Sequence, residues 1–128
     1  MSNFNFLQKQ WPDIYKEAKE AEQLTLLSPK ASAILTRGAL EMAINWIYTN
    51  DNKLARPFND SLSGLIHEQS FRELIEPQMF RELNLIRYNG NDGAHGKRVQ
   101  QSDAIVSIKN LFRFLSFSLI VLISTISS

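Results

Sequence analysis

The stretch "RYNGNDGAHG", residues 87–96, gathers several chemically capable side chains around three glycines. Arg87, Asn91 and His95 follow one another at intervals of four residues. Because four residues turn an α-helix through about 400°, the three side chains would lie within an arc of roughly 80° if the helix continued. A cation, an amide and an imidazole would then share one face.

This trio suits the cleavage of RNA without a metal ion. A histidine such as His95 can transfer a proton near neutral pH, and the charge of Arg87 can offset that of a phosphate. The amide of Asn91 can orient either group. The first interpretation of the stretch is therefore an active site.

The second interpretation is structural, because glycine disfavours a continuous helix by about 1 kcal/mol relative to alanine. The glycines are Gly90, Gly93 and Gly96. In this interpretation Asn89-Gly90 ends the preceding helix with a left-handed residue, and Asn91 and Asp92 hydrogen-bond the turn. His95 then caps the helix or packs beneath it. The residue types alone favour this alternative.

Arg37 and Glu41, in "RGALE", lie one helical turn apart on an earlier helix. Most such pairs are solvated and contribute only a few tenths of a kcal/mol. If their face meets Arg87, a partly buried charge network would fix the two helices in register. We therefore predict Arg37 and Glu41 as supporting residues of the cluster formed by Arg87, Asn91 and His95.

Other chemistry finds little support in the sequence. The chain has no cysteine and two histidines, so a metal site is not predicted, and no phosphate-binding loop is present. "PDIYKEAK" holds the letters of a PD-(D/E)xK nuclease site, but inside one helical pattern they cannot place two carboxylates around Mg²⁺. His67 is expected to cap a helix or lie at the surface, and Trp11 and Trp46 are expected to pack rather than stack on bases. No cofactor is predicted for this chain.

The composition is that of a single soluble domain, residues 1–128, with 44% hydrophobic residues and a net charge of +1. This charge gives no field for sequence-blind binding of nucleic acid. The N-terminus lacks a secretory signal. The uncharged run Phe114–Ser128 is 15 residues long, shorter than a bilayer span of roughly 18–20 residues. It predicts a buried last helix rather than a membrane anchor, and a cytoplasmic protein.

Helix signals recur along the chain, and no long stretch alternates with a period of two. Pro12, Pro29 and Pro77 mark helix starts, with Ser28 as an N-cap before Pro29. Residues 50–60 read as a loop that ends at a capping Asn59 or Asp60, before a short helix over residues 61–69. Ser102 with Asp103 caps the last and most apolar helix. The predicted fold is all-α, with four or five helices around one core.

Four segments of the sequence resemble a known family. They are "NFNFLQKQWPDIYKEAKEAE" (3–22), "SPKASAILTRGALEMAINWIY" (28–48), "PFNDSLSGLIHEQSFRELI" (57–75) and "LIRYNGNDGAHG" (85–96). Together they resemble the N-terminal helical domain of type I restriction enzyme R subunits (HsdR), a domain-of-unknown-function family also fused to other DEAD/DEAH helicases. The combination of "RGALE" with "IRYNGNDGAH" is the specific part of the likeness, whereas either segment alone would be a weak signal.

The resemblance implies a docking or scaffold domain of a restriction subunit that continues beyond residue 128. The absent parts would be a PD-(D/E)xK nuclease and an ATP-dependent translocase, with ATP and Mg²⁺ acting there. The implied partners are the other subunits of the restriction complex, DNA through that complex, and a second copy of the chain.

The family is also similar to the HEPN helical domains, some of which are dimeric, metal-independent RNases with an Arg, four to six residues and then a His. Here seven residues separate Arg87 from His95. This departure favours a binding role over catalysis. The RNase remains the alternative function.

Overall fold

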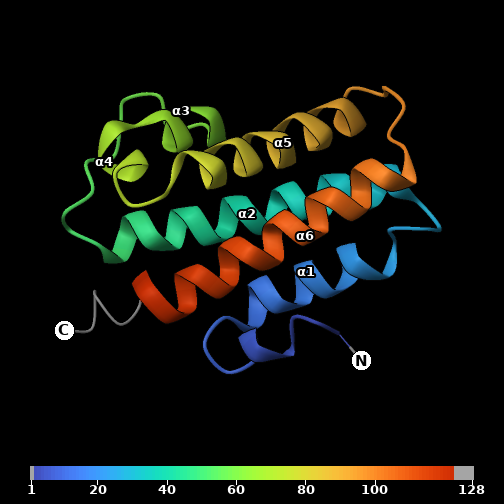
Figure 1. Cartoon of the computed structure of the whole chain (residues 1–128), viewed down its shortest axis with the longest axis horizontal. Coiled ribbons are helices and arrows are strands. Elements are labelled where there is room, and N and C mark those ends of the chain that lie inside the picture. Colours follow the sequence, from blue (N-terminus) through green and yellow to red (C-terminus); the bar gives the residue numbers. More distant parts are fainter. Residues whose placement is uncertain (1, 123–128) are drawn as a thin grey trace.

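The computed structural model describes residues 2–122, and helices dominate that range (Figure 1). In chain order the elements are the 3-10 helix η1 (Asn5–Leu7), α1 (Pro12–Gln23), α2 (Pro29–Asn50), α3 (Leu62–His67), α4 (Gln69–Arg72), α5 (Pro77–Ala94), α6 (Gln101–Phe117) and the π-helical turn η2 (Ser118–Leu122). The predicted all-α class is confirmed. The described residues hold six α-helices, one more than expected, because the region after residue 60 forms two short helices in place of one.

Three helices begin as their prolines predict. Pro12, Pro29 and Pro77 each stand at the first helical position, where the missing N–H removes no intrahelical bond. Ser28 caps α2 because its Oγ accepts a hydrogen bond from the N–H of Ala31 at 3.4 Å. Local sequence therefore determines where α1, α2 and α5 start.

Two predicted caps were wrong by one or two residues. The N-cap of α3 is Ser61, whose Oγ accepts from the N–H of Gly64 at 3.2 Å, and not Asn59 or Asp60. Asn59 instead accepts from the N–H of Ser61 at 3.2 Å and forms the turn that precedes the helix.

The N-terminus of α6 also differs from its prediction. The cap is Gln100, whose N–H donates to Oδ2 of Asp103 at 3.0 Å, whereas Ser102 lies inside the helix. A carboxylate three residues into a helix can satisfy the N–H of the cap residue. Asp103 is therefore a capping residue as expected, but it caps from within the first turn.

Helix α2 is the centre of the bundle. It packs against α1, α5 and α6, and Figure 1 shows α6 crossing in front of α2 with α5 on one side and α1 on the other. Its inner face is fully buried at Ala39, Leu40, Ala43, Ile44 and Ile47. Trp11 is buried, and its ring meets that of Trp46 edge to face, with the ring centroids 5.3 Å apart. The packing roles predicted for the two tryptophans are confirmed.

The last helix is buried on one side. Residues Gln101–Val121 form a 21-residue stretch that is long and apolar enough to cross a membrane by length and composition, and 44% of its most apolar window is buried. Ala104, Ser107, Leu111, Phe114 and Leu115 form the inner face. Residues 123–128 of the predicted apolar helix lie outside the described residues. As far as the chain is described, α6 is a core helix with one outward face.

Tyr48 ties α2 to α3. Its hydroxyl donates to the carbonyl oxygen of Leu65 at 2.7 Å, and its ring stacks on Phe71 with the centroids 6.0 Å apart. Burial raises the pKa of Tyr48 to about 12, and the negative charge of Glu68 acts in the same direction, against the opposing charge of Arg56. The folded protein therefore retains this proton where the unfolded chain loses it.

Replacing Tyr48 with phenylalanine should lower the free energy of unfolding by about 1 kcal/mol near neutral pH, because the bond to Leu65 is lost. In the wild type, the stability linked to this proton is complete below pH 10 and declines as the pH rises to about 12. Tyr48→Phe should lack that part of the decline. Urea unfolding monitored across this range measures both effects, and identical pH slopes for the two proteins would contradict the assignment.

Candidate functional site on helix α5

Helix α5 continues through the motif to Ala94, so the left-handed turn predicted at Asn89-Gly90 was wrong. Within residues 2–122 only Gly96 has a positive φ, at 77°. His95 is the C-cap, and its backbone N–H donates to the carbonyl oxygen of Asn91 at 2.9 Å. The helix therefore ends one and a half turns later than the glycines suggested.

Gly90 and Gly93 serve the crossing of α5 with α2. A Cβ atom at Gly90 would lie 2.5 Å from Cβ of Arg37 and 3.1 Å from the carbonyl oxygen of Ala33. A Cβ atom at Gly93 would lie 3.1 Å from the carbonyl oxygen of Lys30. Contacts this short leave no room for a side chain on α5. The glycines let the two helix backbones approach, which outweighs their cost to the helix.

Arg37 reaches across this crossing. Its Nη1 donates to Oδ1 of Asn91, so a cation on α2 and an amide on α5 are joined directly. A hydrogen bond from a charged donor is stronger than a neutral one and fixes the register of two helices. Glu41 is exposed and, among the described residues, forms no ion pair with Arg37. The supporting contact therefore involves Arg37 alone.

Arg87 is held within its own helix. Its Nε and Nη2 donate to Oδ1 of Asn84 at 3.2 and 3.1 Å, and the guanidinium lies 4.5 Å from the centre of the Tyr88 ring. Asn84 is buried and donates from Nδ2 to the carbonyl oxygen of Phe80 at 3.3 Å. These contacts fix the direction of a half-buried cation beside an exposed tyrosine.

His95 stands apart from the rest of the cluster. It is exposed, and its imidazole has no hydrogen-bond partner within residues 2–122. His95 follows Arg87 by eight positions, a rise of about 12 Å along the axis. The structure thus joins Asn91 to Arg37, places Arg87 and His95 on the same helix, and does not bring these last two side chains together.

Two contributors to this surface were absent from the predicted cluster. Asn84 stands three residues before Arg87, a spacing at which helical side chains meet, and this signal is present in the sequence. Tyr88 is 55% exposed, a property that depends on how α5 rotates against α2 and that no local pattern carries. The candidate site is therefore defined as the α5 surface: Arg87, Tyr88, Asn91 and His95, with Arg37 and Asn84 beneath.

His67 lies at the surface, as expected for a histidine at a helix end. Its Nδ1 is 2.7 Å from the carbonyl oxygen of Ser63, and its ring is edge-on to Phe80 with the centroids 5.2 Å apart. Among the described residues, no group of three or more His, Cys, Asp or Glu side chains is placed to hold a metal ion.

The fold and the α5 surface define an all-α helical bundle with a polar cluster on one outer helix. Residues 19–120 match the family model described as "Domain of unknown function (DUF4145)". This match covers most of the chain, and the chain belongs to that family. Comparison with curated proteins and with solved structures finds no match.

Gly90→Ala should destabilise the protein although alanine is the better helix former. The added methyl group meets Arg37 and a backbone oxygen on α2, and such overpacking costs about 1–3 kcal/mol. Gly38→Ala is the matched control, because its Cβ would meet only the carboxylate end of Glu17, which can move. That variant should be neutral or up to about 1 kcal/mol more stable. Thermal unfolding decides, and equal midpoints for the two variants would contradict the close crossing.

A double-mutant cycle tests the bond between Arg37 and Asn91. Asn91→Ala and Arg37→Ala should each lower the free energy of unfolding by about 1–2 kcal/mol, and the double variant should lose less than the sum. Glu41→Ala should change stability by under about 0.5 kcal/mol, because Glu41 is an exposed side chain. Denaturant unfolding of the four proteins gives the coupling energy. If the losses of the two single variants add up to the loss of the double variant, the bond between Arg37 and Asn91 does not stabilise the fold.

Proposed function

We propose that this chain is a non-catalytic docking or scaffold domain at the N-terminal end of a type I restriction enzyme R subunit. The observation that carries the proposal is how the motif uses its polar groups. Arg87 binds Asn84 within α5, and Asn91 binds Arg37 on α2. The first contact fixes the Arg87 side chain on its own helix and the second joins two helices, which suits a rigid binding surface better than proton transfer.

The two segments that carry the resemblance, "RGALE" and "IRYNGNDGAH", are also the two that touch. Arg37 belongs to the first and Asn91 to the second. The proposal extends to the parent protein: a cytoplasmic, site-specific deoxyribonuclease that uses ATP and Mg²⁺ elsewhere in its chain to cut foreign DNA.

The α5 surface has the residue types of a protein interface. Tyr88 is exposed with Arg87 stacked against it, and Leu85 is exposed one turn earlier. Tyrosine and arginine are enriched among residues that dominate binding energy, and side chains fixed beforehand lose less entropy on binding. We expect the other subunits of the restriction complex to bind at the α5 surface. DNA would then be a partner of this chain only through the assembled complex.

The alternative function is a HEPN-like, metal-independent RNase. One observation favours it: the His95 imidazole is exposed and forms no hydrogen bond or ion pair with the described residues. Since Arg87 lies about 12 Å away along the helix, a second copy of the chain would have to supply the cation. This alternative therefore requires a homodimer formed across α5.

Binding of the purified chain to the remaining subunits of the restriction complex tests the docking role. Arg87→Ala and Tyr88→Ala should each weaken binding about tenfold, the loss typical of a central interface residue. Lys16→Ala, an exposed cation on α1, is the matched control and should bind like the wild type. Thermal midpoints measured alongside separate lost binding from lost folding, since Arg87 also supports Asn84.

The same preparations are incubated with labelled single-stranded RNA and duplex DNA in EDTA. We expect intact nucleic acid with both the wild type and His95→Ala. Cleavage of RNA by the wild type that disappears in His95→Ala would overturn the docking role in favour of the RNase. Failure of all variants and the wild type to bind the subunits would also overturn it.

A further inference from the structure

Apolar side chains remain exposed along the outer face of α6. Ile105, Val106 and Phe112 are each at least 36% exposed, and Phe6 of η1 packs edge-on against Phe112 with the centroids 5.7 Å apart. In Figure 1, α6 runs across the near side of the bundle with no other element over it. The outer side of a surface helix is ordinarily polar, and contiguous apolar surface on a small domain marks an interaction site.

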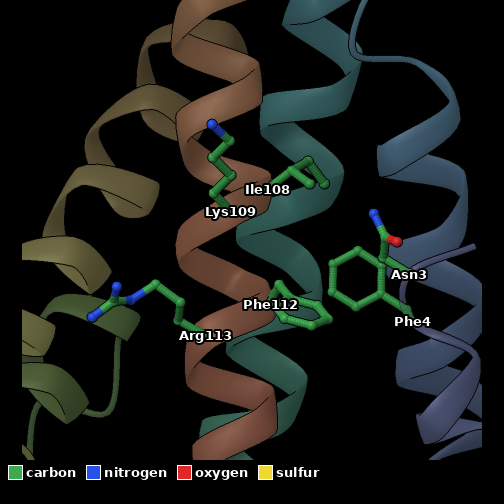
Figure 2. Close-up of a pocket in the computed structure, with 6 residues that line it drawn as sticks. All are labelled: Asn3, Phe4, Ile108, Lys109, Phe112 and Arg113. Atoms are coloured by element: carbon green, nitrogen blue, oxygen red, sulfur yellow. The ribbon is translucent and has the colours of Figure 1, made fainter.

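This face borders a cavity of about 420 Å³ between α6 and the N-terminal segment. Its lining comprises Asn3, Phe4, Ile108, Lys109, Phe112 and Arg113 (Figure 2). Figure 2 shows the rings of Phe112 and Phe4 side by side, and they meet edge to face with the two centroids 5.9 Å apart. Ile108 and Phe112 are one helical turn apart, so both border the same hollow. The accessible apolar lining of the groove therefore comes from Ile108 and Phe112 of α6, and the buried Phe4 supports Phe112 from the N-terminal side.

The N-terminal wall of the groove is fixed by α1. The Ser2 hydroxyl donates to Oε1 of Glu22 at 2.7 Å, and the N–H of Asn3 donates to Oε2 of the same carboxylate at 3.2 Å. Phe4, the next residue, is fully buried. Because these contacts hold the N-terminal segment in place before a ligand binds, less conformational entropy is lost on binding.

The charges along this face have one sign. From Ala104 to Val121 the sequence contains Lys109 and Arg113 and no acidic residue. Figure 2 shows Arg113 extending away from Phe4 toward α5, where its Nε lies 3.3 Å from Oε1 of Glu82. Lys109 is exposed and has no ion-pair partner within the described residues. The unneutralised charge at the groove is therefore the ammonium group of Lys109.

We propose that this groove docks an acidic amphipathic helix of a partner protein. Apolar side chains of the partner pack against the exposed parts of Ile105 and Phe112, and a carboxylate beside them pairs with Lys109. The stretch from Ile105 to Phe112 rises about 10 Å, the length of two helical turns. The inference concerns α6 and stands whether or not the α5 surface binds restriction subunits.

Charge disfavours the simplest alternative occupant, a second copy of the same face. A twofold axis through the centre of α6 would set Lys109 near Lys109 of the other copy. Like charges this close are unfavourable, whereas carboxylates relieve the excess charge. The concave shape between α6 and the N-terminal segment also suits a helix better than a flat lipid surface.

The test uses a synthetic helical peptide of about three turns, with leucine on one face and glutamate on the flanking positions. Its binding to the purified chain is measured by fluorescence anisotropy beside a scrambled peptide of the same composition. We expect the amphipathic peptide to bind at least about tenfold more tightly than the scrambled one. Phe112→Ala and Lys109→Glu should each weaken it about tenfold, whereas Lys16→Glu on α1 should change it by less than about twofold.

Several outcomes would overturn the proposal. These are equal binding of both peptides, binding that Lys109→Glu leaves intact, capture by phosphatidylserine vesicles in place of the peptide, or self-association through α6 in sedimentation runs. Because Lys109 is exposed and unpaired in the described chain, Lys109→Glu keeps the fold and decides the matter even if Phe112→Ala unfolds. A lost interaction at the α5 surface would leave this result unchanged.

Discussion

The close approach of the α2 and α5 backbones is the constraint on which the rest of the bundle depends. Two glycines on α5 face main-chain atoms of α2, and Arg37 bridges to Asn91 beside them. Because part of this contact is backbone, no rotamer change can accommodate a larger residue there. This backbone contact fixes the rotation of α5 about its own axis. The rotation in turn determines that Arg87, Tyr88 and His95 lie on the outward side of the helix.

Much of the fold can be predicted from short stretches of the sequence. Prolines at first helical positions and the hydroxyl of Ser28 predict the starts of three helices, and the apolar stripe of α2 predicts a central helix. The cap of α3 could not be chosen, because Asn59, Asp60 and Ser61 are consecutive residues that can all cap a helix. Only the path of the loop decides which oxygen meets the N–H of Gly64.

The motif at Asn89-Gly90 shows why part of the site could not be predicted. A glycine after an asparagine commonly ends a helix, and a glycine inside a helix commonly marks a close neighbour. A helix end and a close helix contact therefore have the same sequence pattern, and only the position of α2 in the fold distinguishes the two. Arg37 and Glu41 are equal candidates for supporting residues, because the sequence does not show which side of α2 meets α5. In the structure Arg37 bonds to Asn91, whereas Glu41, one turn further along α2, is exposed to solvent.

The separation in sequence between the two sides of the crossing has a consequence for how the chain folds. Helices α1 with α2, and α5 with α6, are neighbours in sequence and form two helical hairpins, whereas Arg37 and Asn91 are 54 residues apart. Local hairpins form quickly, but joining them requires closing the long segment that contains α3 and α4. We expect the docking of the two hairpins to limit the folding rate. Because the glycines lie where the hairpins meet, they would then affect how fast the chain folds as well as the shape of the α5 surface.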